Sequence, residues 1–153
     1  MASGLAKKTT LVEIISSLLV ILFIYTGLNK LLDHETFHAQ LRQSPFIQPL
    51  AGFISATLPA GELLIALALI LKRTRLIGLY LSFFIMVVFT GYVYAMLHYS
   101  YYLPCSCGGI LSSLTWKDHL LFNSIFTILA ATGALLQSKI KSLDTMQNIT
   151  SPA

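Results

Sequence analysis

Four long apolar runs constrain the fold of this chain more than any other feature. They cover residues 10–32, 50–71, 76–98 and 116–138, and each has about the twenty residues that an α-helix needs to cross a bilayer. Charged residues make up only 10% of the sequence, whereas an ordinary soluble domain has roughly a quarter. So few charges cannot cover a water-exposed surface. The sequence therefore predicts an all-α membrane protein, a four-helix transmembrane bundle in a lipid bilayer.

Lysines and arginines fall unevenly on the two sides of such a bundle. Seven of them lie on the side of the termini: Lys7, Lys8, Lys72, Arg73, Arg75, Lys139 and Lys141. Three lie on the other side: Lys30, Arg42 and Lys117. Because positively charged loops stay in the cytoplasm, we expect both termini to be cytoplasmic. No basic stripe with interleaved aromatic residues occurs, so nucleic acid is not an expected partner.

The two ends of the chain lie outside the apolar runs. Residues 1–9 are a short polar segment, and residues 139–153 continue no periodic apolar pattern, so we expect a disordered cytoplasmic tail. Thr10 and Glu13 fit the T-x-x-E capping box that opens many helices. The first spanning helix is therefore expected to begin near Thr10.

Both cysteines of the chain lie in one loop, between the third and fourth runs and opposite the termini. Cys105 and Cys107 are one residue apart and are followed by Gly108 and Gly109. A disulfide across so short a ring is strained and easily reduced, which suits exchange better than a permanent staple. The glycines allow a tight turn and the approach of another protein's sulfur. The loop therefore predicts a redox pair; a structural bridge and a thiolate site for Cu(I) are the alternatives.

No second cysteine pair exists in the sequence. A redox role therefore needs an external thiol partner or an acceptor such as a quinone. The side opposite the termini is the oxidising one, where disulfides form and persist. We expect the fourth helix to begin just after this loop, because Thr115 and Asp118 fit a T-x-x-D capping box.

Glu62 lies near the middle of the second run, three residues after Pro59. An ionisable side chain at that depth is costly and usually faces the interior of the bundle. Polar side chains expected at similar depth are Thr90 on the third helix and Asn123 and Thr127 on the fourth. These residues predict an intramembrane polar pocket for a quinone headgroup or a proton relay. The alternative is a neutral glutamic acid whose hydrogen bonds fix the helix packing.

Residues 33–43 predict a short amphipathic helix after the first spanning helix, on the outer side. Within it, residues 34–38 match H-E-x-x-H, in which two histidines one turn apart hold zinc and the glutamate acts as base. A zinc protease also needs a third ligand and a substrate cleft. Since charged and polar neighbours surround His34 and His38, they are weak metal candidates, and two solvated histidines are the favoured explanation.

Three segments, in this order, resemble the MauE family, the methylamine-utilisation membrane proteins related to DoxX-like four-helix proteins. They are residues 25–33 (YTGLNKLLD), residues 58–63 (LPAGEL) and residues 105–109 (CSCGG). The resemblance covers about residues 10–137. It implies a bacterial inner-membrane protein that helps a disulfide-rich periplasmic dehydrogenase subunit to mature. The implied partner is a periplasmic thioredoxin-like or substrate protein.

The outline is also similar to membrane disulfide-forming enzymes of the vitamin K epoxide reductase and DsbB types. Those enzymes carry C-x-x-C beside a quinone pocket and use a second cysteine pair, whereas this chain has C-x-C alone. We therefore predict a thiol–disulfide oxidoreductase or maturation factor that depends on a partner. The alternatives are a non-enzymatic assembly or scaffold subunit with a structural C-x-C clip, and the zinc protease.

Overall fold

The computed structural model describes residues 2–99 and 115–150 of the chain. These residues form five α-helices and one short 3-10 helix, with no strand among them: α1 (Ala2–Leu32), α2 (His34–Gln43), η1 (Gln48–Leu50), α3 (Ala51–Ile70), α4 (Arg75–Tyr99) and α5 (Trp116–Thr150). The four longer helices are long and apolar enough to cross a membrane. The prediction of an all-α, four-helix membrane bundle is confirmed.

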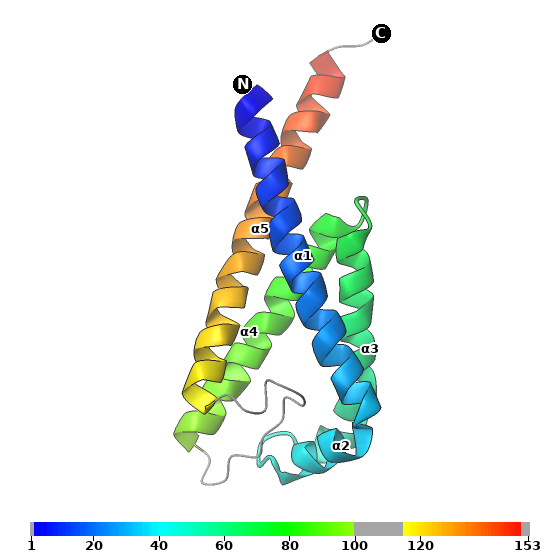
Figure 1. The fold of residues 1–153 in the computed structure, drawn as a ribbon, viewed down its shortest axis with the longest axis vertical. Coiled ribbons are helices and arrows are strands. Elements are labelled where there is room, and N and C mark those ends of the chain that lie inside the picture. Colours follow the sequence, from blue (N-terminus) through cyan, green and yellow to red (C-terminus); the bar gives the residue numbers. More distant parts are fainter. Residues whose placement is uncertain (1, 100–114, 151–153) are drawn as a thin grey trace.

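The helices are arranged so that both chain ends lie at one end of the bundle (Figure 1). α1 packs along α3, and α4 packs along α5, while α1 also contacts α5 and α3 contacts α4. α2 lies across the opposite end, beside the end of α1 and the beginning of α3. α1 and α5 extend well beyond the turn between α3 and α4 at the end that carries the termini.

One face of α1 supplies the centre of the apolar core. Val12, Ile15, Leu19 and Phe23 recur at helical spacing and are almost fully buried. Large apolar side chains on the outward faces are exposed instead, as for Ile21 at 66%. An apolar exterior over an apolar interior is what a bilayer favours, because lipid tails solvate apolar side chains as well as a protein core does.

The turn between α3 and α4 is tight because Gly78 lets the two backbones approach. A Cβ atom at Gly78 would lie 2.9 Å from the backbone nitrogen of Leu69. The last carbonyls of α3 receive side-chain donors from the turn: Thr74 Oγ1 donates to Ala68 O at 3.0 Å and Arg75 Nε donates to Leu69 O at 3.2 Å. The turn thus satisfies carbonyls that a helix end otherwise leaves unpaired.

Two predicted helix ends differ from the structure. α1 begins at Ala2, so Glu13 lies inside the helix and faces Arg75, with its Oε1 3.7 Å from Nη1, rather than capping a first turn. α5 continues to Thr150, where we expected a disordered tail from residue 139. Ile140 explains the continuation, because it is 8% exposed and packs in the same apolar cluster as Val12 of the lengthened α1.

The short helix expected after α1 is present as α2. Its apolar face is buried, with Phe37 and Leu41 packing against Ala51 at the beginning of α3. Asp33 stands at the N-cap, although its side chain makes no capping hydrogen bond. α2 therefore closes one end of the space between the spanning helices.

Candidate functional site

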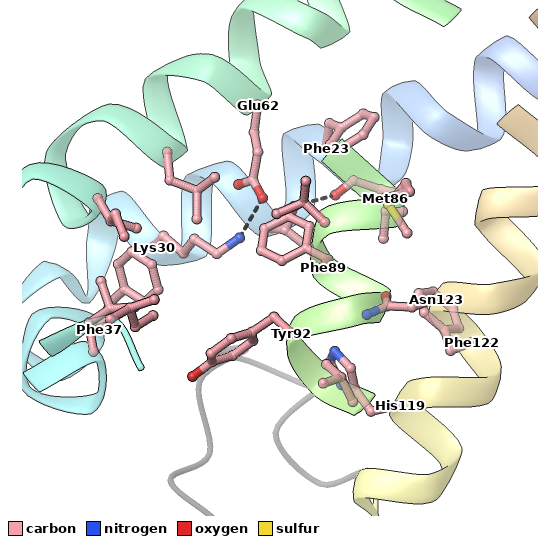
Figure 2. Close-up of a pocket in the computed structure, with 18 residues that line it drawn as sticks. Phe23, Lys30, Phe37, Glu62, Met86, Phe89, Tyr92, His119, Phe122 and Asn123 are labelled. Carbon is pink, nitrogen blue, oxygen red and sulfur yellow. Dashed lines mark hydrogen bonds and ion pairs between the residues drawn. The ribbon is translucent and has the colours of Figure 1, made fainter. Parts of the chain in front are cut away.

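A cavity of about 270 Å³ lies inside the bundle, at the end that α2 closes. α1, α3, α4 and α5 all contribute to its wall, together with α2 (Figure 2). Most of the described residues that line it are apolar. Its polar lining residues are Thr26, Lys30, Glu62, Tyr92, His119 and Asn123.

Lys30 and Glu62 form a buried ion pair on one wall of the cavity. Lys30 Nζ of α1 lies 2.5 Å from Glu62 Oε1 of α3, and the two side chains are only 7% and 1% exposed. Oε2 of Glu62 has no hydrogen-bond partner among the residues that the structure describes. Burying two charges is costly even when they are paired, and the cost is higher still within a membrane. Such a pair at a cavity wall therefore marks a candidate functional site.

Two aromatic rings also lie near the lysine. Lys30 Nζ lies 5.2 Å from the ring centroid of Phe89 on α4 and 5.8 Å from that of Phe37 on α2. Both distances are within the range of cation–π attraction. The ammonium is thus held between a carboxylate and two aromatic rings, which fixes where its N–H donors lie.

A glycine brings the two charged helices close enough for this contact. A Cβ atom at Gly27 would lie 3.3 Å from the Leu63 side chain and 3.4 Å from the Pro59 carbonyl oxygen. Gly27 and Lys30 are three residues apart on one helix, as are Pro59 and Glu62 on the other, so each pair shares a helix face. The segments 25–33 and 58–63, far apart in the sequence, therefore pack together to build the ion pair.

The opposite wall is polar as well. The Tyr92 hydroxyl of α4 donates to Ser44 Oγ at 3.0 Å. His119 and Asn123 of α5 are 8% and 7% exposed. Figure 2 shows the side chains of Tyr92, His119 and Asn123 extending into the space across from Lys30 and Glu62. The cavity thus has an apolar middle between two polar walls.

Comparison with known protein families gives a match that covers most of the chain. A family model described as "Methylamine utilisation protein MauE" matches residues 8–136, which reach from α1 into α5. The chain belongs to the MauE family. No curated protein and no solved structure matches it. The residues that build the ion pair all fall inside the matched region of this MauE family protein.

The residues of the predicted intramembrane pocket fall into two groups in the MauE family bundle. Glu62 and Asn123 both line the cavity, on different walls. Thr90 and Thr127 lie beside each other, 3.2 Å apart between their hydroxyl oxygens, and do not line it. Each threonine hydroxyl also donates to a backbone carbonyl four residues earlier in its own helix, which is ordinary for a membrane helix.

The other predicted site residues lie elsewhere. Cys105, Cys107, Gly108 and Gly109 fall outside the described residues. His34 and His38 lie on α2 with stacked rings whose centroids are 6.2 Å apart. No group of three or more potential metal-binding side chains occurs among the described residues. The Thr115–Asp118 cap is present, with Thr115 Oγ1 donating to Asp118 Oδ2 at 2.6 Å and accepting from the Asp118 backbone N–H at 3.3 Å.

Lys30 is the site residue that sequence reasoning missed, because it was counted only as an outer-side charge. A signal for it exists in the sequence. Glu62 in the middle of a span needs a cation, and Lys30 lies within an apolar run, 10–32, rather than in a loop. Tyr92 and His119 gave no comparable signal, since their contribution depends on how α4 and α5 are rotated about their axes.

Proposed function

We propose that this MauE family protein is a membrane thiol–disulfide factor in which Cys105 and Cys107 exchange electrons with a periplasmic protein. The observation that carries the proposal is that the only two cysteines of the chain share the segment between α4 and α5. The end of α4 and the beginning of α5 lie opposite the two termini. Seven of the ten lysines and arginines lie on the side of the termini, which by the positive-inside rule favours the oxidising compartment for the cysteine segment.

The exchange needs only the two thiols and a partner disulfide. One cysteine, as the thiolate, attacks a sulfur of the partner's disulfide, forms a mixed disulfide and releases one partner thiolate. The other cysteine then attacks the mixed disulfide, which closes the Cys105–Cys107 bond and releases the second partner thiolate. Two electrons pass to the partner in this direction. The reverse sequence of steps delivers a disulfide to a reduced partner.

The partner class follows from the family and from the compartment. The family is described as methylamine utilisation proteins. The resemblance of this chain to that family implies a role in the maturation of a disulfide-rich periplasmic protein. Such a protein needs disulfides to be formed or reshuffled before it folds. A thioredoxin-like carrier or the maturing protein itself is therefore the proposed partner, in the periplasm beside the inner membrane.

Trapping of mixed disulfides in cells tests this function. Each single variant, Cys105→Ser and Cys107→Ser, removes one cysteine and so prevents resolution by the other. We expect one of the two to accumulate partner-linked species on non-reducing gels that disappear on reduction. Ser106→Ala is the matched control in the same segment and keeps both thiols, so it should accumulate none.

The result also separates the alternatives. If neither single cysteine variant yields a reducible complex, the exchange reading is wrong and a scaffold subunit with a C-x-C clip is favoured. Zinc bound in stoichiometric amount that is lost in His34→Ala would instead favour the metalloprotease.

A further inference from the structure

Two polar groups at the cavity wall have hydrogen-bonding capacity that their ion pair does not use. Glu62 is 1% exposed, lines the cavity, and has one carboxylate oxygen without a hydrogen-bond partner among the described residues. The Lys30 ammonium has three N–H donors, of which one meets Glu62 Oε1. One wall of the cavity therefore offers both an acceptor and donors to a ligand. Leaving such groups unsatisfied in a buried site is costly, so a ligand that meets them is strongly favoured.

The shape of the site restricts the ligand. Between the Lys30–Glu62 wall and the wall formed by Tyr92, His119 and Asn123 the lining is apolar. A fitting ligand has a compact apolar body with a polar group at each end. A sterol or an acyl chain has a polar group at one end only.

One residue of the cavity lining is also exposed on the outer surface of the bundle. Val88 lines the cavity and is nevertheless 52% exposed on the outside of α4. In a bilayer that exposed face of α4 contacts lipid tails. A ligand can thus enter from the membrane and leave a long apolar tail among the lipids while its head occupies the cavity.

From these observations we infer that the cavity binds the headgroup of a membrane quinone. In the oxidised ligand, Lys30 donates to one carbonyl oxygen. In the reduced ligand, the hydroxyl at that position donates to Glu62 Oε2. The second oxygen of the ring faces the wall of His119 and Asn123. One wall that supplies both a donor and an acceptor suits a ligand that changes from acceptor to donor when it is reduced.

The role of the bound quinone rests on the thiol–disulfide function proposed above, whereas its binding does not. The balanced step is the oxidation of the dithiol form of Cys105 and Cys107 by the quinone. Two S–H bonds break and one S–S bond forms, while the two quinone carbonyl oxygens gain two electrons and two protons to give the quinol. The quinone thereby supplies the electron acceptor that a single cysteine pair lacks.

Fluorescence of the single tryptophan tests the binding directly. Trp116 is the only tryptophan in the chain, and its ring lies 6.5 Å from the ring of His119, which lines the cavity. Ubiquinone-1 is titrated into the full-length protein, held in phosphatidylcholine nanodiscs free of other quinones. We expect saturable quenching of Trp116 fluorescence. The double variant Lys30→Met/Glu62→Gln, which leaves no unpaired buried charge, should bind at least about tenfold more weakly, as the loss of a hydrogen bond to a charged group implies.

Three further variants distinguish the outcomes. Thr90→Val removes a hydroxyl outside the cavity and should change the affinity less than about twofold, within the usual effect of a distant substitution. Val88→Phe adds bulk at the exposed edge of the cavity lining, outside the buried core. It should weaken binding even if the double variant folds poorly. Cys105→Ser/Cys107→Ser should bind as the wild type does. Quenching that does not saturate, or that is equal in wild type, Val88→Phe and the double variant, overturns the inference.

The two proposals fail separately in this design. Saturable binding without any trapped mixed disulfide would leave the quinone site standing and remove the thiol–disulfide function. Trapped mixed disulfides without saturable quenching would leave the thiol–disulfide function standing and remove the quinone site.

Discussion

Substitution of Lys30 provides the clearest test of how the site is built. Lys30→Met leaves the Glu62 carboxylate, 1% exposed, without its cation. Breaking a buried pair by removing one partner costs about 3–5 kcal/mol, which lowers the ratio of folded to unfolded protein by roughly two to four orders of magnitude. Glu62→Gln leaves Lys30 alone in the same way. The double variant Lys30→Met/Glu62→Gln removes both charges and should be more stable than either single variant.

The comparison is made as a double-mutant cycle. The free energy of unfolding is measured for the four proteins in mixed detergent micelles with increasing dodecyl sulfate, with Trp116 fluorescence and circular dichroism as probes. We expect a coupling between the two positions of at least about 2 kcal/mol, within the range found for residues in direct contact. Effects of Lys30→Met and Glu62→Gln that add to within about 0.5 kcal/mol would show that the two residues do not interact.

Three further substitutions test the packing that positions the site, each by the free energy of unfolding or by hydrogen exchange. Gly78→Ala should destabilise the bundle by about 1–3 kcal/mol, as overpacking does, because the added Cβ would lie 2.9 Å from the Leu69 backbone nitrogen. The control Gly91→Ala should not destabilise it, because a Cβ there would have no atom within 4 Å. Thr115→Ala removes the cap of α5 and should cost about 1 kcal/mol, seen as faster amide exchange in the first turn of α5 only. Ile140→Ala should destabilise the packing of α5 on α1 by about 2 kcal/mol or more, because Ile140 is only 8% exposed. Equal rates of amide hydrogen exchange in residues 139–146 of the variant and the wild type would contradict that packing.

The membrane fold was predictable from the sequence because its signal is spread over many residues. Four apolar runs of spanning length leave few alternatives to a helical bundle. The short turn between residues 70 and 75 also makes α3 and α4 direct neighbours in the bundle. The helix ends were less predictable. No local pattern in residues 139–150 indicates a helix. α5 continues there because Ile140 packs in the same apolar cluster as the lengthened α1.

The candidate site was only partly predictable, for a physical reason. Depth in the bilayer follows from position along a run, so Glu62 and Asn123 were both expected near the middle of the bundle. Rotation about the helix axis does not follow from depth. It is the rotation of α4 that turns Thr90 toward Thr127 and Tyr92 toward the cavity. The pairing of Lys30 with Glu62 likewise depends on the close approach of α1 and α3 at Gly27.

The most direct test of the central claim is thiol labelling of Cys105 and Cys107 in intact cells. A maleimide that does not cross the inner membrane is applied with and without prior reduction, and the gel shift of the protein counts the free thiols. We expect no labelling before reduction and two labels after it, both added from the periplasmic side. Labelling only after the inner membrane is permeabilised would contradict the proposed orientation. Two free thiols that stay unoxidised in growing cells would contradict the direction of exchange in which the cysteine pair delivers a disulfide to its partner.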